Sequence, residues 1–432
     1  MHFRNFSFFC LQITKRRGFI MNRTEKFAIY NHRLVNSDDH RITEKSFIVL
    51  KHSDGTQTFT SFHKYVHNSS HPVRKYNSND RSAFIFIVKF LNYAFFTAGI
   101  SSLAELDVNI GRDFLNAYGM HNLSDDDEYT RRSKTTVQKC VDSVMNFYIN
   151  LINDKKSGVH IKSDELYRTI SSRNKYGKAV RKRIPVFEVR YVSDVKAPIF
   201  RDIPNKAFSL LFDHIAKEHT ELLGLVMNQA FAGLRPSEAC NVRRTDSPLG
   251  PGIRFKEVNG RLYRVEIDLT QELNLRSDCL YVGGIKKERT AIVPDIFLSA
   301  YRDAYNIYTE YMNVRAYEAD YGAFSVNKQG KAITYASYSQ KFRDIIKNEM
   351  IPIYLKSTDS ELVLYGQTLM EHSLSPHVFR HWFTVQLVLS GINEPGTLMA
   401  FRGDTSPESA LTYINNKGDL EKQFSRITNE TF

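Results

Sequence analysis

The sequence predicts an α+β fold that is mainly helical, with a small β-sheet. Apolar residues recur every three or four positions across 83–115, 137–151 and 208–231, which is the period of helices that bury one face. Strand-like runs border a turn at Asp54-Gly55 and another at 283–289. A chain of 432 residues with 42% hydrophobic content can bury more than one core, so we expect two or three domains.

The first 80 residues contain a hairpin signature. Within 46–60, two strand-like runs are joined by Asp54-Gly55, a dipeptide that suits a tight turn between antiparallel strands. We therefore expect a small β unit within residues 1–80. The amphipathic stretches that follow predict a small helical bundle over residues 81–165.

Residues 166–198 read as a basic linker between domains. Between 171 and 190 there is one acidic residue, Glu188, and few apolar residues. A basic strap of this kind can follow a phosphate backbone and release its counterions, although a charged linker can also be merely solvated. The candidate DNA-binding residues are Arg173, Lys175, Lys178, Arg181, Lys182 and Arg183.

Composition narrows the class of partner. The net charge of +12 and the pI of about 9.3 favour an anionic partner such as nucleic acid, although ribosomal and membrane-surface proteins can be equally basic. The four cysteines are far apart and no histidines cluster at zinc-finger spacing, so we expect no metal site. No apolar run approaches the roughly 18 residues of a membrane span, which predicts a soluble protein.

The residues after 233 contain an arginine at a predicted helix start. A helix is expected over Phe208–Phe231, and Gly233 interrupts it before Arg235-Pro236. Proline is favoured at the first helical position, so Arg235 lies near the N-cap of a second helix that runs to about Val242. There its planar, permanently charged guanidinium can hold two phosphate oxygens. We expect Glu238 to hold this turn together.

The residues after 375 repeat this arrangement. Ser375 is the expected N-cap and Pro376 the first helical residue of a helix that ends near Gly391. Three side chains follow at i, i+3 and i+4 and share one face, which suits phosphate: His377, Arg380 and His381.

Two further elements complete the set. The strand-like runs 278–282 and 290–293 border a basic turn that contains Lys286, Lys287 and Arg289. A last helix is expected to open at Ser406-Pro407, with Tyr413 two turns inside it.

Together these segments resemble the tyrosine recombinases, the phage-integrase family. The resemblance rests on Gly-Leu-Arg-Pro-Ser-Glu at 233–238, Pro-His-Val-Phe-Arg-His at 376–381, the Lys-Glu-Arg turn at 287–289, and the spacing from Gly403 to Tyr413. It covers roughly the last 230 residues. It implies a catalytic domain at 199–432 preceded by a helical SAM-like core-binding domain, and it makes an arm-binding role for the N-terminal β unit an alternative to a structural cap.

The resemblance also implies a chemistry. Arg235 and Arg380 would clamp the phosphate, Tyr413 would attack it, His377 would assist the tyrosine, and Lys287 would protonate the departing 5′-oxygen. Cleavage and rejoining would pass through a 3′-phosphotyrosine intermediate with no metal, ATP or other cofactor. Glu238 and His381 would support the site.

One position departs from the family pattern. Asp404 follows the glycine where the family has His or Trp, and an ionised Asp cannot donate a hydrogen bond to phosphate. This places the sixth catalytic position in doubt, and His381 or His372 could substitute. The alternative function is a catalytically impaired DNA-binding relative that acts as an accessory or regulatory protein.

The remaining expectations concern partners and competing classes. The resemblance implies double-stranded DNA as partner, a homotetramer on paired DNA sites, an accessory DNA-bending factor and no membrane. It points to a bacterial mobile element or phage, and hence to a cytoplasmic, nucleoid-associated integrase. The sequence contains no G-x-x-x-x-G-K-S/T phosphate loop and no motif that would place carboxylates around two metals, which argues against nucleotide-driven and metal-dependent enzymes.

Overall fold

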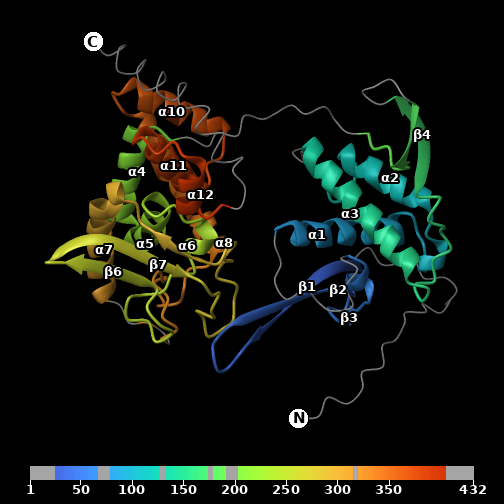
Figure 1. Ribbon diagram of the computed structural model, residues 1–432, viewed down its shortest axis with the longest axis horizontal. Coiled ribbons are helices and arrows are strands. Elements are labelled where there is room, and N and C mark those ends of the chain that lie inside the picture. Colours follow the sequence, from blue (N-terminus) through green and yellow to red (C-terminus); the bar gives the residue numbers. More distant parts are fainter. Residues whose placement is uncertain are drawn as a thin grey trace. The chain divides into compact units, whose positions relative to one another are not determined.

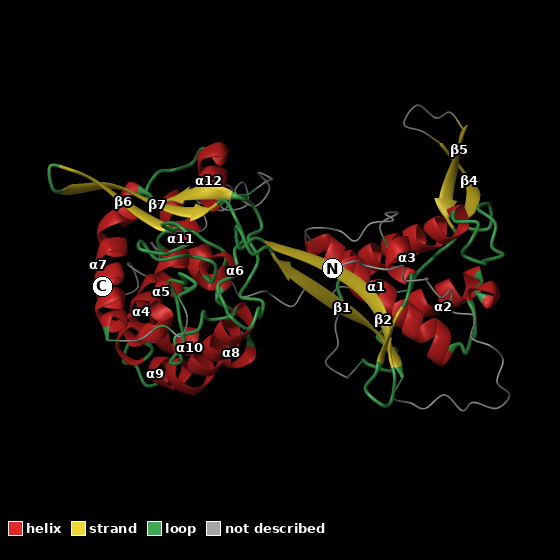
Figure 2. Cartoon of the chain, turned by 90° about the horizontal axis from the view of Figure 1, so that it is seen from below, coloured by secondary structure: helices red, strands yellow, loops and turns green. Residues whose placement is uncertain are grey.

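The computed structural model of the protein describes residues 25–66, 78–126, 132–173, 179–190, 203–314, 317 and 320–404 (Figure 1). Two compact units divide the chain. The first consists of Met1–Leu34 and Thr43–Ala197, and the second of Val35–Ile42 and Pro198–Phe432. The α+β fold that the sequence predicts is confirmed, because both units contain runs of helices together with small antiparallel sheets (Figure 2).

The N-terminal sheet has the strand order β1-β2-β3. Its strands are β1 (Lys26–Val35), β2 (Ile42–Lys51) and β3 (Gln57–Phe59). The predicted hairpin is confirmed, with Val49 opposite Phe59 in an antiparallel register. Gly55 adopts φ +84° in the turn, where the Asp54 carboxylate accepts a hydrogen bond from the Thr56 amide. The sequence did not predict β1.

Helices follow this sheet, as the apolar period predicts. They are α1 (Ser78–Asn92), the π-helical turn η2 (Tyr93–Thr97), α2 (Val108–Gly119) and α3 (Lys134–Asn153), with 3-10 turns η1 (Phe62–Tyr65) and η3 (Leu103–Glu105). Aromatic rings form much of the core of this unit. The ring of Phe90 lies 5.4 Å from that of Phe114 and 5.6 Å from that of Tyr148.

Part of the predicted linker forms a hairpin. Strands β4 (Tyr167–Arg173) and β5 (Ala179–Pro185) pair antiparallel over their whole length. The chain then packs on α2, where the Arg190 amide donates to Asn116 Oδ1 at 2.9 Å. A Cβ on Gly119 would overlap the Arg190 carbonyl, so this packing requires a glycine in α2. Residues 191–202 lie outside the described residues.

The second unit contains one three-stranded sheet and most of the helices. Its strands, in the order β6-β7-β8, are β6 (Ile253–Val258), β7 (Arg261–Leu269) and β8 (Arg289–Ile292), and all pairs are antiparallel. Its helices are α4 (Asn205–Glu218), α5 (Thr220–Ala230), α6 (Pro236–Ala239), α7 (Leu298–Asn313), α8 (Tyr335–Ile345), α9 (Ile351–Leu355), α10 (Ser360–Glu371), α11 (His377–Leu389) and α12 (Pro395–Arg402), with a 3-10 turn η4 (Asp295–Phe297) and a π-helical turn η5 (Ile346–Met350).

Aromatic packing fixes α4 against α11, which carries three of the candidate site residues. The indole of Trp382 stacks on Phe208 with ring centroids 3.7 Å apart, and its Nε1–H donates to Asn205 Oδ1 at 2.8 Å. Phe383, the next residue on α11, stacks on Phe297 at 5.4 Å. None of the described helices is both long enough and apolar enough to cross a membrane.

Two predictions about this unit are wrong. The helix expected over Phe208–Phe231 is broken at His219, which has non-helical dihedral angles of φ −132° and ψ 42°. The run 278–282 forms no strand, because β8 pairs with β7 and not with the segment just before the basic turn. Hydrogen bonding to a more distant strand therefore overrides the local hairpin pattern.

Candidate active site

Three arginine side chains converge on one carboxylate, that of Asp404. Arg235 and Arg380 both donate from Nη2 to Oδ1, each at 2.7 Å. Arg402 donates from Nε to Oδ2 at 2.6 Å. The site thus holds one carboxylate oxygen between two guanidinium groups that come from sequence positions 145 residues apart.

The turn that carries Arg235 is built as the sequence predicts. Arg235 is the N-cap of α6 and Pro236 is its first residue, although α6 ends at Ala239 and not near Val242. The Arg235 amide donates to Glu238 Oε2 at 3.1 Å, so the Glu238 side chain closes the first turn of α6 onto its N-cap residue. Gly233 adopts φ +65° against the ring of Phe383, where a Cβ would overlap the ring.

Glu238 is the buried counter-ion of the site. Its side chain is 0% exposed and accepts hydrogen bonds from Arg235 Nη1 at 2.8 Å and from Arg289 Nη2 at 2.9 Å. Burial by itself would raise the pKa of Glu238. The hydrogen bond and charge of Arg289, together with the charge of Arg235, outweigh burial and lower the pKa below its ordinary value. Glu238 is therefore ionised at neutral pH.

Gly403 ends α12 and lets Arg289 approach the site. It adopts a left-handed conformation with φ +61° at the helix C-terminus. A Cβ at this position would overlap the guanidinium of Arg289, so two independent requirements favour glycine here.

Helix α11 supplies Arg380, the second arginine that binds Asp404 Oδ1. Arg380 is 5% exposed and also donates to the Gly233 carbonyl oxygen. Burial, followed by the charges of Arg235 and Arg402, lowers the pKa of Arg380 to about 9, so its guanidinium remains protonated at neutral pH. Arg402 donates from Nη1 to Thr384 Oγ1 at 2.5 Å, one turn beyond Arg380 on the same helix.

Charge at the site is unbalanced in favour of an anion. Four guanidinium groups, including that of Arg289, face the two carboxylates of Glu238 and Asp404, which leaves two positive charges in excess. Burial would raise the pKa of Asp404, but the charges of Arg380, Arg402 and Arg235 lower it, so this carboxylate is ionised as well. A phosphodiester carries the charge and the acceptor oxygens that such a cluster can bind.

The other predicted residues lie at different distances from this centre. Lys287 is exposed and its Nζ donates to the Asp404 carbonyl oxygen at 3.3 Å. His377 is exposed at the first position of α11, one turn before Arg380, and His381 is half-buried one residue after it. Pro376, and not the predicted Ser375, occupies the N-cap position. Tyr413 and the helix predicted around it lie outside the described residues.

The predicted DNA-binding residues lie on the β4–β5 hairpin or between its strands. Arg173 ends β4, while Arg181, Lys182 and Arg183 lie on β5, where Arg181 is exposed. Lys175 and Lys178 lie outside the described residues.

Two arginines of the site, Arg289 and Arg402, are not identified by any motif. Arg289 ends the Lys-Glu-Arg run, and Arg402 lies just before Gly403. Nothing in the sequence pairs Arg289 with Glu238, 51 residues earlier. The sequence indicates that Asp404 cannot donate a hydrogen bond to phosphate, and the structure adds that its carboxylate is itself bound by three arginines.

Comparison with known proteins gives matches among solved structures alone, since no family model and no curated protein matches the chain. The chain is similar to the XerH site-specific recombinase bound to difH substrate in a pre-cleavage complex, at 15% identity over 77% of this chain and 76% of that chain, with a TM-score of 0.43. It is similar to the Tn1549 transposon integrase in complex with transposon right end DNA, at 13% identity over 84% and 97%, with a TM-score of 0.46. A third similarity is to the XerA recombinase, at 15% identity over 84% and 95%, with a TM-score of 0.33.

Substitution of Glu238 by Gln tests its role as the buried counter-ion. We expect Glu238→Gln to lose about 3 kcal/mol of unfolding free energy at pH 7, because Arg235 and Arg289 lose their shared negative charge. The pKa of Glu238 is lowered on folding, so its stabilisation is complete above pH 4.5, the ordinary value, and fades as the pH falls below it. The difference between variant and wild type should therefore shrink in acid.

Urea unfolding followed by the fluorescence of Trp382, the only tryptophan of the chain, measures this difference in the second unit. Glu257→Gln is the matched control, because Glu257 pairs with Arg302 at the surface and should cost less than about 1 kcal/mol. Equal losses in the two variants, or a difference that does not depend on pH, would contradict the buried role of Glu238.

Alanine at Gly403 tests the close approach of Arg289. Gly391 is the control, since it follows α11 with φ +98° and has no atom within 4 Å of an added Cβ. We expect Gly391→Ala to lose about 1 kcal/mol from backbone strain alone, and Gly403→Ala to lose at least about twice as much because Arg289 must also move. The same Trp382 unfolding assay measures both, and similar losses would show that Arg289 does not pack on this glycine.

Proposed function

We propose that the protein is a site-specific DNA recombinase or integrase of the tyrosine recombinase family. It would cleave and rejoin DNA through a 3′-phosphotyrosine intermediate without metal or ATP. One observation carries this proposal: Arg235 and Arg380 both donate to a single anionic oxygen, Asp404 Oδ1, each at 2.7 Å. Two guanidiniums in this arrangement can hold the nonbridging oxygens of a phosphodiester and offset the charge that grows on them during transfer.

Besides the two arginines, Arg235 and Arg380, the reaction needs three further groups. The Tyr413 hydroxyl oxygen attacks phosphorus, a P–O bond forms, and the bond to the 5′-oxygen breaks. A tyrosine with a pKa of about 10 needs its proton accepted, and His377, one turn from Arg380 on α11, is the candidate acceptor. Lys287 is the candidate donor of a proton to the departing 5′-oxygen. A 5′-hydroxyl of another strand reverses the step, so the bond energy is retained.

Preorganisation of the arginines supports this chemistry. Glu238 fixes Arg235, and the Gly233 carbonyl fixes Arg380, before any substrate arrives. Charges that are already oriented stabilise a transition state without the cost of reorganising at the moment of reaction. Holding these cations close together costs folding free energy. A phosphate site requires such a cluster, whereas a structural core does not.

The rest of the chain fits a DNA-binding role in this proposal. Residues 81–165 would form the core-binding domain and 199–432 the catalytic domain, with 166–198 between them and an arm-binding or structural role for 1–80. A groove in the first unit is lined by Arg112, Arg168 and Arg190 among others, and Arg181 on β5 is exposed. Double-stranded DNA would be held as substrate by a homotetramer on paired sites in a bacterial cell, with an accessory DNA-bending factor.

A second candidate function is favoured by the position of Asp404. Its carboxylate occupies both arginines that would bind the phosphate, so a chain that cannot displace it would bind DNA without cleaving it. In that case the protein is a catalytically impaired relative of the tyrosine recombinases, with an accessory or regulatory role.

A suicide-substrate assay tests the proposed activity. Purified protein is mixed in EDTA with nicked duplex DNA from the flanks of its own gene, and covalent adducts are separated in denaturant. We expect a protein–DNA adduct with wild type and none with Tyr413→Phe, which removes the attacking oxygen. Phe at another tyrosine of the second unit, the exposed Tyr263, is the control and should leave the adduct unchanged. An adduct that survives in Tyr413→Phe would refute the assignment of the nucleophile.

Neutralising Asp404 separates the two candidate functions. If the carboxylate competes with phosphate, Asp404→Asn should bind the same DNA about tenfold more tightly, since a like charge is removed from the site. For an active recombinase the adduct is formed by both wild type and variant. For the impaired relative it appears only in Asp404→Asn, and unchanged DNA affinity would show that Asp404 does not occupy the phosphate position.

A further inference from the structure

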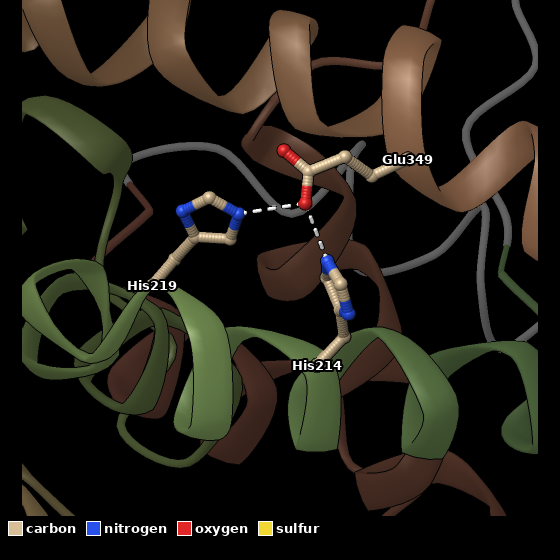
Figure 3. Close-up of side chains that lie close together, drawn as sticks. All are labelled: His214, His219 and Glu349. Atoms are coloured by element: carbon tan, nitrogen blue, oxygen red, sulfur yellow. Dashed lines mark hydrogen bonds and ion pairs between the residues drawn. The ribbon is translucent and has the colours of Figure 1, made fainter.

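Three side chains with metal-binding atoms converge in the second unit, on elements other than those of the arginine site (Figure 3). His214 lies on α4, His219 lies at the break between α4 and α5, and Glu349 lies on the π-helical turn η5. Glu349 Oε2 lies 2.6 Å from His214 Nε2 and 2.8 Å from His219 Nε2. Among the described residues this is the one group of at least three His, Cys, Asp or Glu side chains whose ligand atoms all lie within 4.8 Å of one another.

The backbone departs from regular α-helix at two of these three positions. In an uninterrupted helix, residues five apart point about 140° away from each other. The break at His219 instead turns its ring toward the same oxygen that the His214 ring faces (Figure 3). Glu349 lies in a π-helical turn, a distortion that is frequent at functional sites. No spacing pattern in the sequence indicates this group, because Glu349 is 130 residues from His219.

We propose that His214, His219 and Glu349 bind one Zn²⁺ ion. Two imidazole nitrogens and one carboxylate oxygen form a common three-residue ligand set for zinc, which leaves a fourth tetrahedral position for water. Nitrogen donors disfavour Mg²⁺ and Ca²⁺, which prefer oxygen ligands.

The observed distances suit entry of the ion. Tetrahedral zinc with bonds of about 2.0–2.1 Å separates its ligand atoms by about 3.3 Å, so the distance to Oε2 must grow by about 0.7 Å for His214 and about 0.5 Å for His219. The Glu349 side chain is 36% exposed, which leaves it room to rotate and leaves the fourth position open to solvent. Binding replaces the hydrogen bonds between the rings and the carboxylate, and it requires neutral imidazoles.

A metal here would tie together two segments that lead into the arginine site. Helix α5 runs from His219 toward Gly233 and Arg235, and η5 is followed by α9, α10 and then α11 with Arg380. The ion would hold the start of α5 against η5 without touching DNA. The inference is independent of the proposed recombinase activity, whose assay is run in EDTA.

Cobalt titration tests the site in the full-length chain without a histidine tag. After chelator treatment and desalting, Co²⁺ should bind one ion per chain with the strong visible absorption of tetrahedral coordination, and Zn²⁺ should displace it. Zn²⁺ at about 100 times its Kd should also raise the Tm by about 5 °C, because it binds the folded state selectively.

Variants then identify the ligands. His219→Ala and Glu349→Gln should each weaken Co²⁺ binding at least tenfold. His52→Ala is the matched control and should bind Co²⁺ as wild type does, because His52 pairs with Glu25 at 2.9 Å in the same way but has no second histidine in its group.

A fourth variant distinguishes the loss of a metal ligand from a general loss of folding. Glu349→Cys should retain Co²⁺ and add a sulfur-to-cobalt charge-transfer band in the near ultraviolet, which only direct ligation produces. The proposal is overturned if wild type gives no tetrahedral spectrum, if the alanine and glutamine variants bind as wild type does, or if the cysteine variant binds Co²⁺ without that band. The three residues would then form only a carboxylate bridge between two imidazoles.

Discussion

The fully buried carboxylate of Glu238 is the interaction on which the arginine site depends. Several like charges cannot be brought together in a protein interior unless a counter-charge is buried with them. Glu238 supplies that charge to Arg235 and Arg289 and also closes the turn that begins α6. Glu238 thus holds the turn of the backbone that presents Arg235, and it also supplies the negative charge that stabilises the Arg235 guanidinium.

Asp404 completes the balance in a different way. It sits at the edge of the cluster, 11% exposed, where Arg235, Arg380 and Arg402 each reach it. The arginines are therefore held in place by two anions, the fully buried carboxylate of Glu238 and the more accessible carboxylate of Asp404. If the chain acts on DNA as proposed, the substrate phosphate would compete with Asp404 and not with Glu238, and the outcome of that competition would decide whether the DNA is cleaved or only bound.

The two histidines and Glu349 form a second polar centre with a different chemistry. The arginines of the first site offer only donors and suit an anion, whereas this centre offers lone pairs and suits a cation. Both depend on interruptions of regular structure, at Gly403 in one case and at His219 and η5 in the other. A zinc ion at the second centre would act on the stability and mutual position of helices, and the proposed phosphoryl transfer would remain free of metal.

Local sequence determined the helices, the β2–β3 hairpin and the turn at Arg235, because apolar period, Asp54-Gly55 and the Pro236 start act over a few residues. It did not determine that β8 pairs with β7, or that the helix predicted over 208–231 is broken at His219. Such features depend on contacts between residues that are distant in sequence. Tertiary structure alone decided that Arg289 would neutralise Glu238 and that Asp404 would receive three arginines. The physical reason is that a buried charge is stable only beside its counter-charge, and folding, not spacing along the chain, brings the two together.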